Sequence, residues 1–202
     1  MPEPIRSHKL IAVEGNDEIQ FFKAFLRHIG CTDYDIREVG GKDQFKRKLP
    51  ALVKTTGFSG VEAFAIIRDA DKDALSSFDS VRNILRNVEL DASDEMNKFS
   101  KSKPSIGVYI MPGNSKEGML EDLCLKTVKD HPTMKCVDPF VQCIMELDEH
   151  PHNLSKAKAQ AFLAAMPEIA NSVGLGAQKG YWGFDSPELE SLKKFFKNFM
   201  EL

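Results

Sequence analysis

Three aspartates follow directly on an apolar run in the sequence AIIRDADKDA, which spans residues 65–74. Asp69, Asp71 and Asp73 are spaced two residues apart, and residues two apart point to the same side of an extended chain. If strand geometry persists, Asp69 and Asp71 present two carboxylates together. Two carboxylates ~4 Å apart repel each other by roughly 4 kcal/mol at an effective dielectric of about 20. A proton, a basic side chain such as Arg68 or a divalent metal must then neutralise this charge.

Several kinds of structure share this pattern of aspartates. Helix capping suits Asp73, which lies just before a helix predicted over 74–88, and turn or capping duty is open for the other two. An EF-hand loop also begins D-x-D-x-D, but it needs glycine at loop position 6 and glutamate at position 12. This chain has Ala74 and Ser80 there, so we exclude that reading. A phosphatase of the haloacid-dehalogenase type, with a strand followed by D-x-D, stays open.

A second acidic position follows another apolar run. Glu14 comes after KLIAV at residues 9–13 and precedes Gly15. Because the carboxyl ends of parallel strands meet at one sheet edge, where open α/β sheets bind ligands, we expect Glu14 to face Asp69 and Asp71. Carboxylate oxygens at such an edge suit Mg²⁺. The alternative is a simple strand-to-helix turn with Asn16 as the N-cap.

Alternating strand and helix patterns position these acids. Apolar runs predict strands over 9–13, 34–39, 61–67 and 105–111, and helical spacing predicts helices over 17–29, 43–53, 74–88 and 117–128. This alternation predicts an α/β fold with a mostly parallel sheet of about four strands, flanked by helices. Further helices are predicted over 138–147, 155–166 and 187–199, with Ser155 and Ser186 as N-caps. We therefore expect an α/β domain over 1–130 and a helical extension over 131–202 that packs on it or caps it.

Composition narrows the class of protein. Hydrophobic residues make up 42% of the 202 residues, enough for a packed core, and the net charge is −3. A nucleic-acid enzyme would therefore need a local basic patch. The four cysteines form no C-x-x-C pair, so we expect mostly buried, reduced thiols in a cytoplasmic protein. No apolar run approaches the roughly 20 residues of a membrane span, so no membrane partner is expected.

The order of these motifs resembles a known family. A strand ending in Glu14-Gly15, then a second strand ending in Asp-x-Asp, is similar to the Toprim domain, over about residues 9–128. Toprim domains occur in topoisomerases, bacterial primases and several nucleases. Glu18, four residues after Glu14, and the sequence LEDL at 120–123 look most like small, largely uncharacterised OLD-like Toprim proteins of prokaryotes. No P-loop is present, so a partner ATPase would have to come from another chain.

The resemblance implies a nuclease that uses Mg²⁺ or Mn²⁺ to hydrolyse phosphodiester bonds in DNA or RNA. Asp69 and Asp71 would bind metal, and Glu14 would bind metal or act as general acid/base. Glu18 and Glu121 would help complete a second metal position, although each also suits the first turn of a helix. Two metals ~3.5–4 Å apart stabilise both the attacking and the leaving oxygen of a displacement.

Basic residues could bind the phosphate backbone. The candidates are Lys42, Lys46, Arg47 and Lys48 after the Gly40-Gly41 turn, and Lys116 before the fourth of the predicted helices. Related OLD nucleases use a late lysine near the metals, for which Lys179, beside Tyr181 and Trp182, is the catalytic candidate.

Two other functions remain open from the sequence. One is a phosphatase or nucleotide phosphohydrolase that uses the same aspartates. The other is a non-catalytic Toprim-like module that binds nucleic acid or a protein, and the chain could also form a homo-oligomer. A buried salt bridge from Arg68 or Lys179 within the acidic residues would favour the module.

Overall fold

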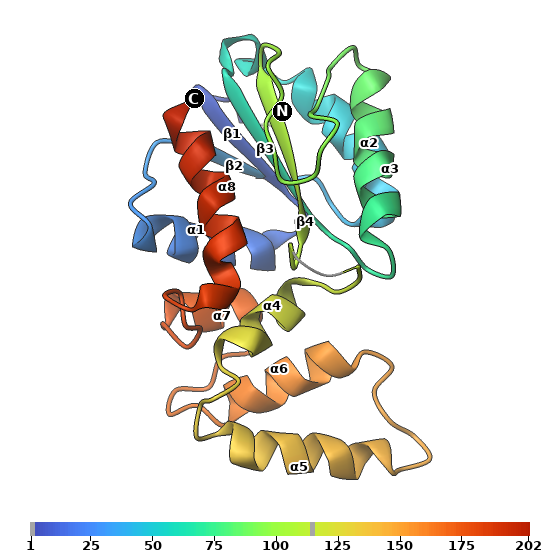
Figure 1. Ribbon diagram of the computed structural model, residues 1–202, viewed down its shortest axis with the longest axis vertical. Coiled ribbons are helices and arrows are strands. Elements are labelled where there is room, and N and C mark those ends of the chain that lie inside the picture. Colours follow the sequence, from blue (N-terminus) through green and yellow to red (C-terminus); the bar gives the residue numbers. More distant parts are fainter. Residues whose placement is uncertain (1–2, 114–115) are drawn as a thin grey trace.

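Four parallel strands form the sheet of the computed structural model, which describes residues 3–113 and 116–202 (Figure 1). The strands are β1 (Lys9–Val13), β2 (Asp35–Glu38), β3 (Ala63–Asp69) and β4 (Ser105–Met111). Their order is β2-β1-β3-β4, and Ala12 of β1 lies opposite Ile66 of β3. β1 and β3 are therefore the two central strands, and their carboxyl ends lie side by side at one edge of the sheet. The predicted α/β class with a parallel sheet is confirmed.

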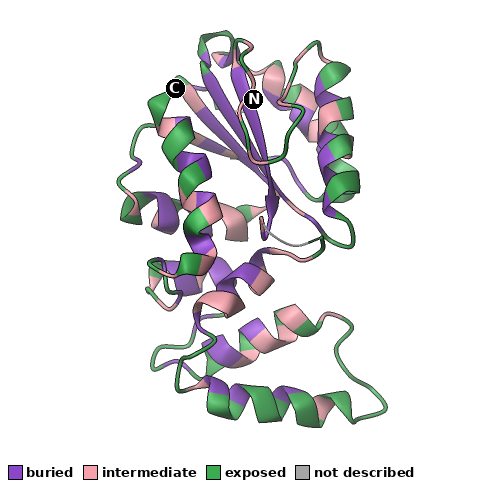
Figure 2. Ribbon diagram, in the orientation of Figure 1, coloured by how far each residue is buried: buried purple, intermediate pink, exposed green. Residues whose placement is uncertain are grey.

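Helices cover both faces of the sheet (Figure 1). Those up to residue 127 are α1 (Asn16–His28), α2 (Lys42–Val53), α3 (Ala74–Arg86) and α4 (Leu120–Thr127), with a 3-10 turn at Phe58–Gly60. Alternate residues of β3 enter different cores: Ala65 and Ile67 pack with α1 and α4, whereas Phe64 and Ile66 pack with α2 and α3. β4 is buried along its whole length, as the purple strands of Figure 2 show. Burial on both faces explains why these strands read as continuous apolar runs.

The remaining helices continue the core on the α1 side. They are α5 (Met134–Met145), α6 (Leu154–Ala164), α7 (Val173–Gln178) and α8 (Glu190–Glu201), with a 3-10 turn at Pro187–Leu189. α8 returns to the sheet beside α1, where the rings of Phe22 and Phe196 lie 5.8 Å apart. α5 and α6 lie beyond α4, away from the sheet (Figure 1). One hydrophobic cluster joins these helices to the sheet, and the division at residue 130 stays a prediction.

The structure corrects several predicted boundaries. Helix α4 begins at Leu120, not at 117, because Gly118 has φ +127° and its backbone pairs with Asp71. The prediction that Ser155 caps α6 is wrong: Asn153 accepts the N–H of Lys156 instead. The cap at Ser186 is confirmed, since its side chain accepts the N–H of Glu188. In the described part of the chain, no helix is long and apolar enough to cross a membrane.

Helix α7 was not predicted, because two of its six residues are glycines, which weaken a helical pattern. These glycines allow close packing on α1. A Cβ on Gly174 would lie 2.4 Å from the carbonyl oxygen of Asp17. The expectation of mostly buried cysteines is half right, because Cys31 and Cys124 are buried whereas Cys136 and Cys143 on α5 are exposed.

Candidate metal-binding site

Glu14 and Asp69 meet where the two central strands end. Glu14 is the first residue after β1, and Asp69 is the last residue of β3. The backbone N–H of Asp69 donates to Glu14 Oε1 at 3.3 Å. The structure thus brings together two acids that are 55 positions apart in the chain.

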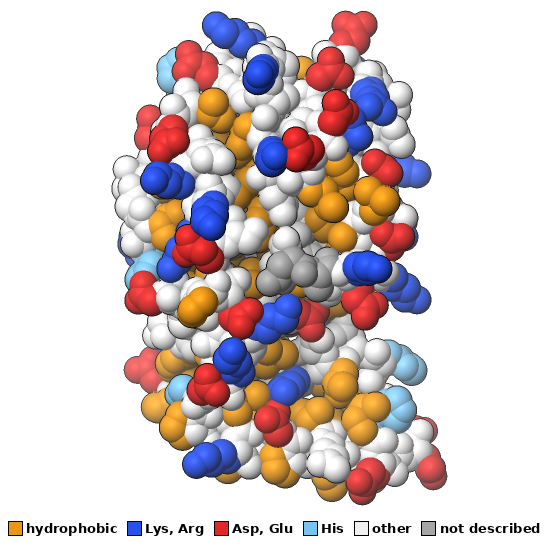
Figure 3. Space-filling model, viewed as in Figure 1, with side chains coloured by type: hydrophobic (Ala, Val, Ile, Leu, Met, Phe, Trp, Pro, Cys, Tyr) orange, Lys and Arg blue, Asp and Glu red, His pale blue; other side chains and the backbone are white. Residues whose placement is uncertain are grey.

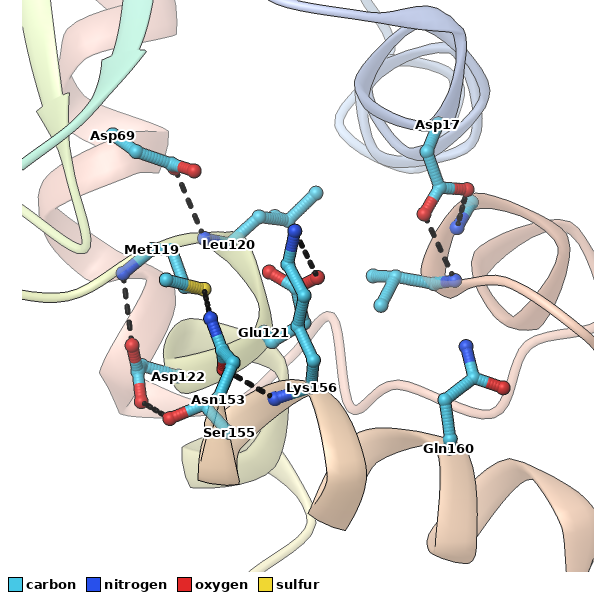
Figure 4. A network of polar contacts seen from close by, with 12 residues as sticks. Asp17, Asp69, Met119, Leu120, Glu121, Asp122, Asn153, Ser155, Lys156 and Gln160 are labelled. Carbon is cyan, nitrogen blue, oxygen red and sulfur yellow. Dashed lines mark hydrogen bonds and ion pairs between the residues drawn. The ribbon is translucent and has the colours of Figure 1, made fainter. Parts of the chain in front are cut away.

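The Asp69 carboxylate also contacts the start of α4. Its Oδ1 accepts the N–H of Leu120 at 3.1 Å, as Figure 4 shows. Burial raises the pKa of Asp69 well above its usual range, and the charges of Glu14, Glu18 and Glu121 raise it further. A raised pKa in a buried carboxyl group surrounded by like charges is typical of a functional site.

Glu18 and Glu121 approach Asp69 from the first turns of α1 and α4. Burial raises the pKa of each, and the charge of Glu121 raises the pKa of Glu18 further. Burial also raises the pKa of Glu14, against the opposing effects of the Asp69 N–H and of Arg68. We call the five carboxylates that interact in this way the acidic cluster: Glu14, Glu18, Asp69, Asp71 and Glu121.

Asp71 joins the acidic cluster by a route that the strand pattern did not predict. The expectation that strand geometry continues to Asp71 is wrong, since β3 ends at Asp69 and Asp71 has φ +53°. Asp71 instead exchanges two backbone hydrogen bonds with Gly118, at 3.0 and 2.9 Å. These bonds tie the loop after β3 to the loop before α4. The Asp71 side chain is exposed, and its charge still raises the pKa values of Glu14 and Asp69.

Three neighbouring aspartates have structural partners instead. Asp73 caps α3, as predicted, by accepting the N–H groups of Leu75 and Ser76.

The carboxylates of Asp17 and Asp122 cap α7 and α4, respectively, and both are drawn in Figure 4. Their donors are the N–H groups of Val173 and Gly174 for Asp17, and the N–H of Met119 and the hydroxyl of Ser155 for Asp122.

Two cations approach the acidic cluster in the described part of the chain. The Nε of Arg68 lies 3.8 Å from Glu14 Oε1, and the Nζ of Lys156 on α6 lies 3.9 Å from Glu121 Oε1. Sequence reasoning missed Lys156, because it depends on how α6 packs against α4. The structure pairs Lys179, the sequence candidate, with Glu168, and no described contact joins it to the acidic cluster.

The acidic cluster has the donor chemistry of a hard-cation site. It offers oxygen ligands only, which suits Mg²⁺ and Mn²⁺, and its carboxylates raise one another's pKa values. Among the described residues, no group of three or more Asp, Glu, His or Cys side chains is already arranged to hold one metal ion. The residues therefore fit a divalent cation by their chemistry and charge, and direct coordination would require side-chain rotation.

Family comparison covers nearly the whole chain. A family model described as "Protein of unknown function (DUF3226)" matches residues 8–201. The chain belongs to this family. The DUF3226 chain is also similar to solved C-terminal regions of OLD proteins, whereas no curated protein matches it. One, from Xanthomonas campestris pv. campestris, is 13% identical, with 95% of both chains covered and a TM-score of 0.46. Another, from Burkholderia pseudomallei, is 16% identical, with 96% of this chain and 99% of that chain covered and a TM-score of 0.47.

The basic candidates of this DUF3226 chain differ in their surroundings. Lys42, Lys46 and Arg47 are exposed on α2, whereas Lys48 pairs with Glu38 at 3.1 Å. Helix α2 starts beside the acidic cluster: a Cβ on its N-cap, Gly41, would lie 3.5 Å from Glu14 Oε2.

Lys116 lies in the loop before α4 and is also exposed, and its carbonyl accepts the N–H of Ala74 at 2.7 Å. On the face drawn in Figure 3, basic side chains lie scattered among acidic ones. This face therefore offers local basic groups and not a broad basic patch.

Proposed function

We propose that this chain is a nuclease that hydrolyses phosphodiester bonds of nucleic acid with the help of Mg²⁺ or Mn²⁺. The observation that carries the proposal is the acidic cluster at the carboxyl edge of β1 and β3. Glu14 and Asp69 meet there, and the motifs to which they belong resemble those of Toprim nucleases. Ligands of open α/β sheets bind at this edge, where the loops after neighbouring strands lead to opposite faces of the sheet.

The chain's own residues would divide the work as follows. Asp69, Asp71, Glu18 and Glu121 would hold the cation, and Glu14 would bind it or move a proton at a phosphoryl oxygen. A bound divalent cation would supply charge stabilisation of the attacking and leaving oxygens. Lys156 is exposed beside Glu121, so its ammonium group could bind a phosphoryl oxygen of the substrate. Lys42, Lys46 and Lys116 could bind phosphates on either side of the cleaved bond.

One observation favours a second candidate function. The approach of Arg68 to Glu14 is the buried pair expected of a non-catalytic module that binds nucleic acid or a protein. This pair counts against the nuclease, because Arg68 already provides Glu14 with a positively charged partner inside the protein. However, four of the five carboxylates have no contact with Arg68 within 4 Å among the described ion pairs. We therefore place the nuclease first.

Incubation with substrates tests the proposal. Supercoiled plasmid, single-stranded DNA and structured RNA would each be incubated with the protein in Mg²⁺, Mn²⁺ or EDTA. The Asp69→Asn/Asp71→Asn variant would be compared with Asp73→Asn, which keeps a good helix cap on the same loop. We expect metal-dependent cleavage that the double variant loses and Asp73→Asn retains. Absence of cleavage, together with a melting temperature that Mg²⁺ does not change, would support the module instead.

A further inference from the structure

Arg68 is a buried charged side chain beside the acidic cluster, and part of its guanidinium lacks hydrogen-bond partners. It is 2% exposed, and its guanidinium lies 5.2 Å from the centre of the Phe45 ring. Neither Nε nor Nη1 has a hydrogen-bond partner among the described residues. Buried N–H donors are nearly always paired, and an arginine normally offers its fork of donors to a carboxylate at about 2.7–2.9 Å.

The nearest carboxylate stays outside hydrogen-bonding distance. Glu14 Oε1 lies 3.8 Å from Arg68 Nε, and the same oxygen accepts the N–H of Asp69 at 3.3 Å. The second oxygen, Oε2, is on the side of Gly41. Glu14 is thus attracted to Arg68 by charge without being locked to it by a hydrogen bond. A loose pair of this kind can exchange partners at a smaller loss than a bidentate pair.

The charges around this pair are unbalanced. Five carboxylates form the acidic cluster, and within 4 Å of them the described residues contribute two cations, Arg68 and Lys156. Lys156 is 61% exposed and reaches Glu121 from solvent, whereas Arg68 is enclosed. Arg68 is therefore the enclosed positive charge beside the acidic cluster, among the residues that the structure describes.

We propose that Arg68 is the internal counter-ion of Glu14 in the metal-free protein, and that Glu14 exchanges this guanidinium for the divalent cation when metal binds. The proposal rests on the metal site of the proposed function and adds a regulatory part to it. Arg68 acts through Glu14 and is a positioning residue. It stabilises the metal-free protein, and it weakens metal binding because it competes for Glu14 and repels the incoming cation.

Substitution of Arg68 separates this role from a structural one. In Arg68→Gln, we expect Mn²⁺ to bind about tenfold more tightly, the effect of removing one unit charge several ångströms from a divalent cation. The melting temperature should fall in EDTA and recover in Mg²⁺. Arg68→Lys keeps the charge and should bind Mn²⁺ with an affinity close to that of the wild type. The matched control is Arg82→Gln, since Arg82 also stacks on a phenylalanine and pairs with carboxylates, but on α3.

Mn²⁺ titration, followed by the electron paramagnetic resonance of free Mn²⁺, measures these affinities without any catalytic assay. Tighter binding in Arg68→Gln, with no change in Arg82→Gln, would support the proposal. Equal or weaker binding in Arg68→Gln would overturn it while leaving the metal site intact. A wild-type protein that binds no Mn²⁺ would overturn the proposed function and this inference together.

A second measurement follows the wild-type protein and does not depend on Arg68→Gln, in case that variant does not fold. The Nε–H resonance of Arg68 can be followed by NMR in arginine-labelled protein and assigned by its absence in Arg68→Lys. We expect Mg²⁺ to shift this resonance, because Glu14 moves away from the guanidinium. A resonance that saturating Mg²⁺ does not change would overturn the proposal.

Discussion

The carboxylate of Asp69 accepts a hydrogen bond from the backbone N–H of Leu120, with 3.1 Å between Oδ1 and N. This contact joins the end of β3 to the first residue of α4, 51 positions later in the chain. It places a buried carboxyl group at the positive end of a helix while four other carboxylates surround it. The contact needs an acceptor oxygen at this position, but it does not need a negative charge.

Asp69→Asn should therefore stabilise the metal-free protein. Asparagine can keep the hydrogen bond to Leu120 while removing a charge that its neighbours oppose. We expect the free energy of unfolding in EDTA to rise by about 0.5–2 kcal/mol, the usual range for a stabilising substitution. Stabilisation by Mg²⁺ should disappear. Urea unfolding with and without Mg²⁺ measures both effects, and Asp73→Asn should keep the wild-type response. A destabilised Asp69→Asn variant that still responds to Mg²⁺ would contradict this prediction.

Stability without metal should fall as the pH rises above about 4. The pKa values of Asp69, Glu14, Glu18 and Glu121 are raised in the folded protein from ordinary values of 3.8 and 4.5. The folded state therefore holds protons that the unfolded state has released, so stability is greatest below the ordinary values and is lost as the pH passes the raised ones. The slope is at most about 1.4 kcal/mol per pH unit for each group.

Urea unfolding between pH 4 and 8 in EDTA, repeated in Mg²⁺, measures this slope. Asp35 and Asp73 have lowered pKa values, so their contributions change at more acidic pH and do not mask it. The fall should be smaller in Asp69→Asn and in Mg²⁺. If the free energy of unfolding in EDTA instead rose between pH 4 and 8, the charged acidic cluster would not destabilise the folded protein, and the prediction would be wrong.

Lys156 should matter more for cleavage than Lys179. Lys156 lies beside Glu121, whereas Lys179 pairs with Glu168. We expect Lys156→Gln to lower the cleavage rate by about 100-fold, the usual cost of removing a group that stabilises developing charge. Its stability should change little, because an exposed ion pair contributes less than about 1 kcal/mol.

Single-turnover cleavage by Lys156→Gln, Lys179→Gln and Lys158→Gln checks this prediction. Lys158 is the control, because it lies on the same helix and pairs with Asp138. A large loss in Lys179→Gln with none in Lys156→Gln would instead support the lysine that the sequence suggested.

Lys42 and Lys46 should bind phosphate groups of the substrate. Both are exposed on α2, whose N-cap lies next to Glu14. Lys42→Gln/Lys46→Gln should weaken nucleic-acid binding, and the slope of log affinity against log salt should decrease by about 0.7–0.9 for each phosphate that the variant no longer binds. Fluorescence anisotropy at several salt concentrations measures that slope. The double variant Lys194→Gln/Lys197→Gln, on α8, changes the charge equally and should keep the wild-type slope.

Asp122 should prove structural, although it neighbours Glu121. It accepts hydrogen bonds from the N–H of Met119 and the hydroxyl of Ser155. Asp122→Ala should lower the free energy of unfolding by about 1–2 kcal/mol, as loss of a helix cap does, while stabilisation by Mg²⁺ persists. Ser155→Ala should add less in the Asp122→Ala background than alone, because the two side chains share a hydrogen bond. Urea unfolding of the single and double variants tests this, and additive losses would contradict it.

The sequence by itself determined the elements and the edge at which the acids gather. Apolar runs of strand length followed by helical spacing can be recognised within short windows of the chain, so the parallel sheet was predictable. Glu14 and Asp69 could be paired in advance, because each lies at the end of a buried strand and parallel strands end at one edge. Asp73 was predictable as a cap, since capping depends on the next few residues only.

Only the tertiary structure decided which other groups surround those acids. Asp71 turns away from strand geometry because its backbone pairs with Gly118. Arg68 lies beside Glu14, where Phe45 of α2 provides a surface for its guanidinium. Lys156 reaches Glu121 because α6 packs on α4. These contacts join segments that are distant in the chain, and local periodicity encodes the faces of helices and strands but not the partners against which those faces pack.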